Sequence, residues 1–156
     1  MAELNPDYIQ QVIERTNHAP FPSHLPFTLE SMDYDTARVR VDIQPHHMQP
    51  YGIVPGGVIA PLIDTATFWA AFARLPEDAG LVNVDLKLNY LKALSEGVLI
   101  AEGRCLRPGR SISYSEAHIH SDQRDLIAHG TSTLMALLGQ GFDLDIPKFL
   151  ESGERP

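Results

Sequence analysis

The segment from Gln49 to Ala66 joins a glycine-containing turn to a nearly all-apolar stretch that carries one carboxylate, Asp64. Gly56 and Gly57 allow the backbone to approach a ligand closely. If a helix starts there, its first backbone N–H groups lack intrahelical partners and can polarise a carbonyl or hold an anion. Burial among apolar neighbours would raise the pKa of Asp64, which makes it a candidate base or nucleophile. The simpler alternatives are a glycine pair that only makes a turn and a carboxylate that caps a neighbour or faces water.

A buried helix must position this carboxylate. Residues 58–73 are apolar almost all round, which is typical of a helix surrounded by core. Pro61 is tolerated only near a helix start, so the regular helix should begin around positions 57 to 60. Several aromatic residues could line an aromatic pocket or simply pack the core, and packing is the simpler reading: Phe68, Trp69, Phe72 and Tyr90.

Strands are predicted on both sides of this helix. Two come before it and four follow it, at residues 27–32, 37–43, 82–90, 98–106, 111–120 and 126–138. Consecutive strands with tight turns pair antiparallel, and the single apolar helix must be wrapped by the concave face of the sheet. The predicted architecture is α+β: a hotdog-like antiparallel sheet around one long buried helix. The second face and the edge of this sheet remain to be buried, which predicts a homodimer.

Length and composition fit one globular domain, with 156 residues, 44% of them apolar and 21% charged. We expect an N-terminal helix and connection at 1–25, because Asn5, Pro6 and Asp7 resemble a helix start. The main domain should span 26–138. The polar tail at 139–156 is expected to be loose or to dock weakly.

Charge and cysteine content exclude several classes of function. The net charge of −8 argues against general nucleic-acid binding and against binding to anionic membranes. The single cysteine, Cys105, cannot form an internal disulfide or a cysteine zinc cluster, which suits a reducing cytoplasm. Neither a signal peptide nor a transmembrane segment is predicted. We therefore expect a cytoplasmic protein with no membrane partner.

Five positions share the spacing of a known motif: Gln49, Gly52, Gly56, Gly57 and Asp64. In this spacing the chain resembles the hotdog-fold acyl-CoA thioesterase superfamily, specifically its PaaI-like, phenylacetate-pathway type. The stretch 82–93 resembles a second hallmark of the family, and the similarity covers roughly residues 39–137. The resemblance implies hydrolysis of an acyl-CoA thioester to a free acid and CoA. It implies no cofactor, since CoA arrives as part of the substrate.

The resemblance also assigns roles to residues. Gly57 would donate its N–H to the oxyanion, and Asp64 would attack the carbonyl carbon or deprotonate a water that does so. Gln49 would orient the water or the carbonyl, and Asn83 would hold the attacking water. In relatives the glycine turn and the acid come from different subunits, so the resemblance implies a homodimer. It leaves open whether two such dimers pair into a tetramer. The positions expected to contact substrate are Pro55, Gly56, Tyr51, Arg107 and Arg110.

One departure from the family pattern is Pro55, where relatives usually carry histidine. Proline has neither an imidazole nor a backbone N–H. One alternative is therefore a protein that binds acyl-CoA or an aromatic ligand without cleaving it. A dehydratase of the same fold is a weaker alternative, since such enzymes usually rely on that histidine. The loop from Arg107 to Arg110 could clamp CoA phosphates or be a solvated hairpin.

Seven histidines raise the question of a metal site. His118 and His120 share a strand face and His46 and His47 are adjacent, but no third ligand stands at a suitable spacing. The sequence therefore predicts no metal site. It also contains no Gly-x-Ser-x-Gly motif of serine hydrolases, and Cys105 lies among apolar residues as a packed thiol would.

Overall fold

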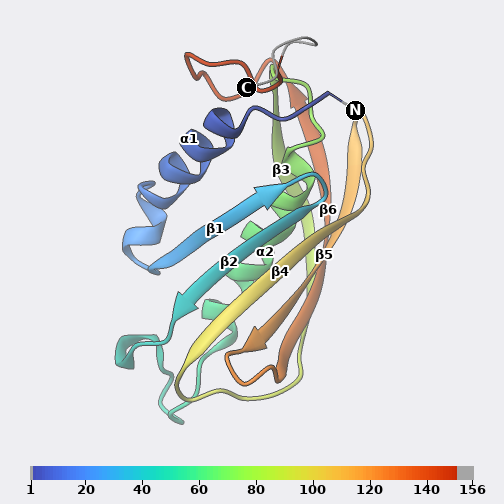
Figure 1. The fold of residues 1–156 in the computed structure, drawn as a ribbon. Helices are drawn as coiled ribbons and strands as arrows, with labels where there is room; N and C mark the ends of the chain where they lie inside the picture. The colour runs from blue at the N-terminus through green and yellow to red at the C-terminus, as the bar shows by residue number, and fades with distance from the viewer. Residues whose placement is uncertain (1, 151–156) are drawn as a thin grey trace.

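A six-stranded antiparallel sheet curves around one long helix in the computed structural model, which describes residues 2–150 (Figure 1). Within residues 2–150, two helices, two short 3-10 turns and six strands follow one another as α1 (Pro6–Asn17), η1 (Phe21–Ser23), β1 (Phe27–Asp33), β2 (Thr36–Asp42), η2 (Pro45–His47), α2 (Gly56–Phe72), β3 (Ala79–Tyr90), β4 (Val98–Arg107), β5 (Ile112–Ser121) and β6 (Leu126–Leu138). The strand order across the sheet is β1-β2-β4-β5-β6-β3. The predicted α+β hotdog fold is confirmed.

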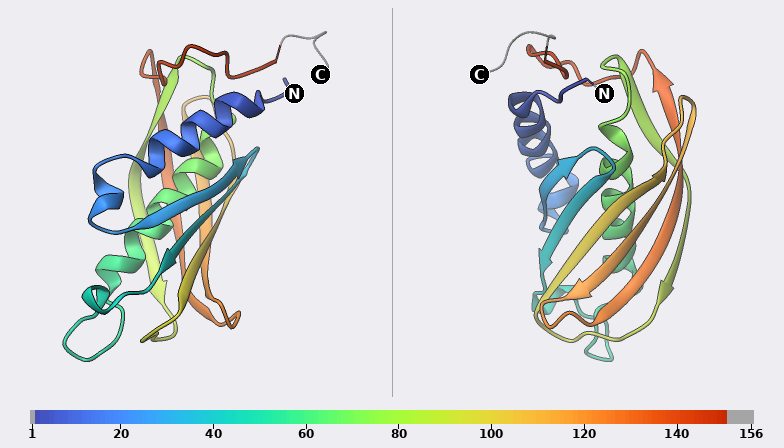
Figure 2. Two further views of the ribbon diagram at one scale, coloured as in Figure 1. Left: turned by 60° about the vertical axis from the view of Figure 1, so that its left-hand side comes forward. Right: turned by 45° about the vertical axis from the view of Figure 1, so that its right-hand side comes forward.

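The first helix, α1, lies outside the sheet beside β1 (Figure 2). Its start is the predicted one, since the Asn5 side chain accepts a 3.0 Å hydrogen bond from the Asp7 N–H. At its other end the Asn17 side chain donates to the Leu29 carbonyl and accepts from the Leu29 N–H, at 3.1 and 2.8 Å. These two bonds give a β1 residue the backbone partners that a neighbouring strand would otherwise supply. They fix α1 to the free edge of the sheet.

The central helix, α2, begins at Gly56, one residue before the predicted range, and Pro55 is its N-cap. Pro61 lies in the second turn, close enough to the start to be tolerated. The sheet approaches this helix closely at Gly103, where a Cβ would overlap the Ala66 carbonyl. No helix among residues 2–150 is long and apolar enough to cross a membrane.

The expectation that consecutive strands pair is wrong for β3 and β4. β3 pairs with β6 at one edge of the sheet, and β4 lies between β2 and β5. The segment after β3 is held to the other end of β6 instead, since the Leu91 and Lys92 N–H groups both donate to the Ile127 carbonyl. β3 is therefore an edge strand. Its edge carries exposed apolar side chains, with Val84 58% exposed and Tyr90 56% exposed.

A β-bulge at Val84 changes which side chains of β3 face α2. Asn83 pairs with Leu134 and Asp85 with the preceding residue Thr133, so Val84 has no partner in the ladder. Before the bulge the inward residues include Leu81, and after it Leu86 and Leu88 pack against the core. Asn83 lies before the bulge, two residues after Leu81, and therefore faces inward as Leu81 does.

The tail from Gly139 to Leu150, which the sequence predicts to be loose or to dock weakly, is anchored to the domain at Lys148 and Phe142. Lys148 is completely buried, and its Nζ donates to the carbonyls of Phe72 and Leu75 at 2.8 and 2.9 Å. It thereby caps the C-terminal end of α2, whose last carbonyls have no intrahelical partners. Phe142 contacts Trp69 and Phe72, with ring centroids 5.9 and 5.6 Å apart. Residues 151–156 of the predicted tail lie outside the described part of the chain.

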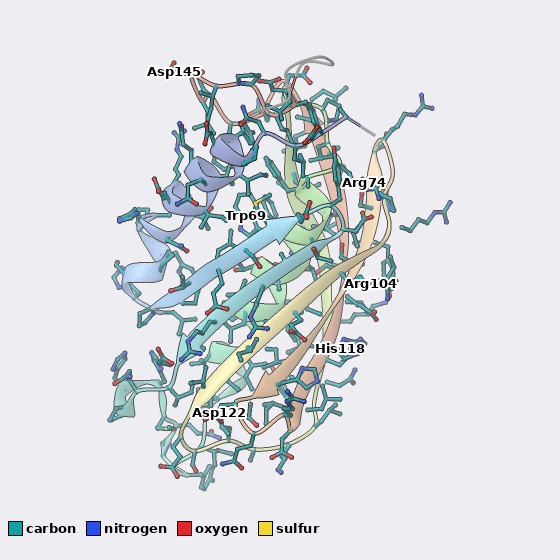
Figure 3. All side chains as sticks on the ribbon, in the orientation of Figure 1. Trp69, Arg74, Arg104, His118, Asp122 and Asp145 are labelled. Atoms are coloured by element: carbon teal, nitrogen blue, oxygen red, sulfur yellow. The ribbon has the colours of Figure 1, made fainter. Side chains whose placement is uncertain are left out.

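The same contacts settle the role of two aromatic residues. Trp69 and Phe72 are 6% and 1% exposed and lie in the core, as the packing interpretation predicts. Figure 3 labels Trp69. Phe68 is only half-buried and Tyr90 is exposed, so these two are not core residues of one chain.

Burial of Lys148 should make stability depend on pH in the alkaline range. Desolvation lowers the pKa of Lys148 from 10.5 to about 8. Between these values the unfolded chain binds a proton that the folded chain does not, so the free energy of unfolding should rise with pH from about 8 to 10. Urea unfolding of the wild type at pH 7.5 and 9.5 measures this gain. Lys148→Met should abolish it, and an equal gain in this variant would contradict the prediction.

Candidate functional site

Asp64 and Asn83 form the polar pair at the centre of the candidate site. The Asn83 side-chain N–H donates a short hydrogen bond to Asp64 Oδ1 and lies 3.4 Å from the Asp64 carbonyl. α2 supplies the carboxylate from its third turn, and the β3 bulge supplies the amide from the facing strand. The predicted partners are therefore brought together. Asn83 Oδ1 is buried and has no hydrogen-bond partner among the described residues, so it can accept one from a bound water.

The environment of Asp64 raises its pKa. Desolvation by burial is the largest cause, and the hydrogen bond from Asn83 opposes it by stabilising the charged form. A carboxylate whose pKa is raised is a stronger base in its ionised form than an exposed carboxylate. This combination suits a general base better than a capping or solvent-facing carboxylate.

Asp64 lies on the one face of α2 that the chain leaves partly uncovered. Gly57 is exposed, and Pro61, Asp64 and Phe68 are half-buried, at spacings of three and four residues along the helix. The residues between them on the opposite side, such as Leu62, are fully buried. The uncovered stripe therefore runs from the start of the helix past the carboxylate.

The start of α2 leaves the Gly57 N–H available. Pro55 caps the helix without a side-chain hydrogen bond, and the first backbone bond runs from the Val58 N–H to the Pro55 carbonyl at 3.0 Å. Within residues 2–150 no acceptor approaches the Gly57 N–H. A Cβ at Gly57 would meet no atom within 4 Å. The geometry thus offers one unused donor at the positive end of the helix dipole, open to an incoming ligand.

Gln49 and Gly56 line a second part of the candidate site. They border a cavity of about 310 Å³ beside the helix start, together with Tyr90, Ile59 and other residues. A Cβ at Gly56 would overlap the ring and hydroxyl of Tyr90. Gly56 is therefore required for packing against Tyr90, in addition to the ligand approach that the sequence predicts. The sequence leaves Tyr90 open between an aromatic pocket and core packing, and its position in the wall of this cavity favours the pocket.

The other predicted substrate contacts are not gathered there within one chain. Tyr51 is 87% exposed in the loop before α2 and does not line the cavity. Arg107 is the last residue of β4. Arg110 lies in the turn between β4 and β5 and borders a different cavity next to Arg74, just beyond the end of α2. α2 has 17 residues, so its two ends lie about 25 Å apart. Contact of these arginines with the same ligand remains a prediction for an assembly of more than one chain.

The separation of Gly57 and Asp64 along α2 limits what one chain can do. Seven residues of helix at a rise of 1.5 Å each place them about 10 Å apart. A donor to a carbonyl oxygen must lie within about 3 Å of that oxygen, and a group that attacks the carbonyl carbon directly must lie within about 3.5 Å of that carbon. The separation therefore excludes direct attack by Asp64 on a carbonyl held by Gly57 of the same chain, and it favours a site in which the two residues come from different chains.

Removing the Asn83 amide should shift the pH dependence of any reaction that uses Asp64 as a base. The hydrogen bond from Asn83 lowers the pKa of Asp64, so Asn83→Leu should raise this pKa. The acidic limb of the kcat/KM profile would then move to higher pH, since protonated Asp64 cannot accept a proton. Profiles between pH 4 and 9 measure the shift. An unchanged limb with a uniformly lower rate would contradict the pairing and indicate loss of packing alone.

Comparison with known proteins shows which family this chain resembles in sequence and in fold. Residues 51–128, half of the chain, match the family model described as "Thioesterase superfamily". A Mycobacterium tuberculosis protein named "Putative esterase" is 29% identical over 121 residues, which are 76% of this chain and 86% of that protein. A "Thioesterase family protein" from Silicibacter pomeroyi has a crystal structure with a TM-score of 0.77 at 25% identity, covering 85% of this chain and 99% of that one.

A third solved structure matches in fold alone. The Escherichia coli PaaI protein from the phenylacetic acid degradation operon has a TM-score of 0.75 at 18% identity, covering 83% of this chain and 93% of that one. Together the named esterases and thioesterases support a hydrolase role for the chain. By its match to the family model over half its length, the chain belongs to the thioesterase superfamily.

Proposed function

We propose that the protein hydrolyses acyl-CoA thioesters at a site built from two copies of the chain. The observation that carries the proposal is the hydrogen bond from Asn83 on β3 to Asp64 on α2. Asp64 lies on the uncovered stripe of α2, about 10 Å from the free Gly57 N–H of the same helix. A second copy that covers this stripe in antiparallel orientation would place its Gly57 opposite Asp64. CoA is proposed from the spacing of Gln49 to Asp64, which the chain shares with acyl-CoA thioesterases.

The edge strand β3 supports a homodimer as the partner arrangement. Its exposed Val82, Val84 and Tyr90 are apolar side chains that a second copy of β3 would cover by extending the sheet. Asn83 lies on the same strand and faces Asp64. A two-fold axis beside β3 would therefore bring both α2 stripes close to the interface.

In the proposed reaction the carbonyl oxygen accepts a hydrogen bond from the Gly57 N–H of one copy. Asp64 of the other copy takes a proton from a water that Asn83 Oδ1 holds, and the water oxygen forms a bond to the carbonyl carbon. The tetrahedral intermediate then expels the CoA thiolate, which recovers the proton from Asp64. The products are a carboxylic acid and CoA, and no cofactor is needed.

The apolar cavity at Gln49 and Tyr90 supports a role in positioning the substrate. Ile53, Val54 and Ile59 line it with apolar surface next to the carbonyl position proposed at Gly57. Gln49, Tyr90 and Lys92 are the side chains with polar groups that line the same cavity, and in this proposal the Gln49 amide orients the carbonyl or the water. Pro55 provides no donor, so the Gly57 N–H carries the oxyanion alone in this proposal.

A panel of short-chain, long-chain and aryl-CoA thioesters, assayed with a thiol-trapping dye, tests the proposed function. We expect release of CoA from at least one class, with saturation kinetics. The parallel measurement is calorimetry with a hydrolysis-resistant CoA thioether. Binding of the thioether without turnover of any thioester would contradict the hydrolase and favour a non-catalytic acyl-CoA binder.

A further inference from the structure

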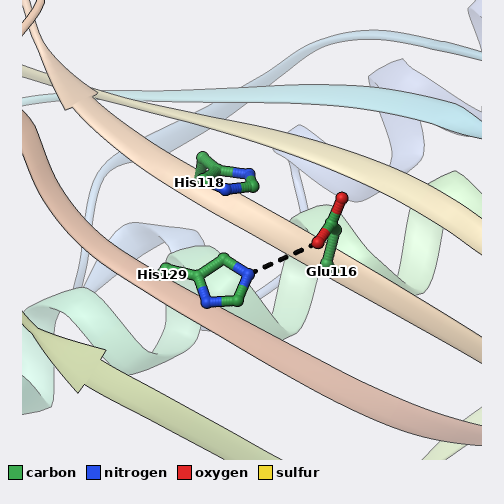
Figure 4. A group of neighbouring side chains, drawn as sticks. All are labelled: Glu116, His118 and His129. Carbon is green, nitrogen blue, oxygen red and sulfur yellow. Dashed lines mark hydrogen bonds and ion pairs between the residues drawn. The ribbon is translucent and has the colours of Figure 1, made fainter.

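Three side chains that can ligate a metal ion gather on the outer face of the sheet, on the side away from α2. Glu116 and His118 lie two residues apart on β5 and therefore share a face. His129 on β6 is the direct ladder partner of His118. Figure 4 shows the three side chains converging above the two strands, with His129 bonded to Glu116.

The distances within this cluster are close to those of a metal site. His129 Nε2 lies 3.4 Å from Glu116 Oε2, and one ligand atom from each of the three residues lies within 4.8 Å of the others. Ligands held tetrahedrally at about 2.0 to 2.2 Å from one ion are about 3.3 to 3.6 Å apart. The His129–Glu116 pair already has this separation. A movement of the His118 ring by about 1 Å would complete the set.

The surroundings leave these groups available. All three side chains are half-buried, and His118 makes ring contacts but no hydrogen bond with the residues described. Arg104 lies opposite Glu116 in the ladder but forms no ion pair with it in the part of the chain that the structure covers. On the other side of His118, Glu102 is engaged by Arg38 at 2.7 Å. Figure 3 places Arg104 and His118 on this outer face.

We propose that Glu116, His118 and His129 bind one divalent transition-metal ion of the zinc type. Two imidazoles and one carboxylate suit zinc, cobalt or nickel, whereas magnesium and calcium require mainly oxygen ligands. Three protein ligands leave a fourth position for water or another ligand. The site lies on the opposite side of the sheet from Asp64. The proposal of metal binding is therefore independent of the proposed thioester hydrolysis.

The sequence predicts no metal site because strand alternation groups His118 only with His120, the next residue on the same strand face. The rings of these two are 6.2 Å apart and stacked, and His120 lies 3.9 Å from Glu102 instead. The missing third ligand comes from another strand. His129 is 11 positions from His118 in sequence, and only the β5–β6 register places them side by side.

Zinc binding to the untagged, metal-free full chain tests the proposal, by competition with a chromophoric chelator. We expect one ion per chain. His129→Ala and the isosteric Glu116→Gln should each weaken binding by ~10-fold or more, as loss of a metal-site group does. Substitution by Co²⁺ should give the intense visible absorption of a tetrahedral site in the wild type and lose it in both variants.

His46→Ala is the matched control, because His46 also contacts a neighbouring histidine, with its ring centroid 4.2 Å from that of His47. It should leave binding unchanged. Far-ultraviolet circular dichroism checks that each variant is folded. The proposal is overturned if zinc binds both cluster variants as tightly as the wild type, if His46→Ala abolishes binding, or if only one ion binds per two chains.

Discussion

Asp64→Asn should lower kcat for the best thioester substrate by ~10³-fold or more, because the substitution keeps the shape of the side chain and removes the base. The variant amide can still bond with Asn83, so the pocket should retain its form. KM should change little, since the lost interaction acts in the transition state. Steady-state kinetics on purified protein measures both quantities. A kcat within tenfold of the wild type would exclude Asp64 as the base or nucleophile.

The same substitution should stabilise the folded protein at neutral pH. Burial raises the pKa of Asp64 above its ordinary value, so the folded state holds this proton more tightly than the unfolded state. The wild type therefore loses stability as the pH rises from about 4 through the raised pKa, whereas a variant with an amide at this position would not. The free energy of unfolding of Asp64→Asn should exceed that of the wild type at pH 7, and the difference should shrink toward pH 4.

A surface carboxylate provides the control for both effects. Asp42 is exposed at the end of β2, where it pairs with Arg40 at 2.6 Å. Asp42→Asn should leave kcat unchanged and should not raise stability, because an exposed pair contributes little. Loss of activity without a gain in stability at position 64 would indicate that the variant disturbs the packing of α2 instead.

Most of the fold follows from local patterns in the sequence, and the exceptions share a physical cause. The apolar run of α2 and the alternation of each strand are local signals, and both predict the observed elements. The position of β3 beside β6 depends on which long-range pairing is most stable, which no local pattern encodes. The docking of Lys148 likewise depends on unpaired carbonyls at the far end of α2.

Local sequence patterns also fail to predict the position of one residue of the candidate site. A strict alternation along β3 would place Asn83 on the outer face with Asp85 and Lys87, and only the family resemblance pairs it with Asp64. The bulge at Val84 reverses the alternation and supplies the physical reason for that pairing. The free Gly57 N–H, by contrast, follows directly from a glycine at a helix start.

Gly57→Pro should lower kcat by ~10²–10³-fold, the usual effect of losing one preorganised oxyanion donor. Proline removes the N–H but fits the first turn of a helix, where this N–H has no intrahelical partner. The preceding Gly56 has no Cβ, which eases the steric restriction that proline places on its predecessor. The fold should therefore survive, as circular dichroism can verify.

Gly57→Ala separates the loss of the donor from the added bulk. Alanine keeps the N–H, and its Cβ would meet no protein atom within 4 Å of the same chain. A loss of kcat that is much smaller than for proline assigns the effect to the N–H. Equal losses in the two variants would mean that bulk at this position, in the partner or the substrate, explains the result.

Co-expression of the two inactive variants can locate the site between copies. If Asp64 of one copy works with Gly57 of the other, a dimer of Asp64→Asn with Gly57→Pro contains one site with both groups intact. Half of randomly formed dimers would be mixed, so about a quarter of wild-type activity should return. If the acid and the donor of a single chain worked together, the mixture would stay inactive.

A mixture of wild type with a double variant tests independently whether the site lies between two copies. A chain that carries both Asp64→Asn and Gly57→Pro breaks both sites of a mixed dimer, because each site then lacks one group. An equal mixture of this chain with wild type should retain about a quarter of full activity instead of a half. Retention of half would mean that each wild-type chain keeps a complete site of its own, which contradicts a site shared between Gly57 of one copy and Asp64 of the other.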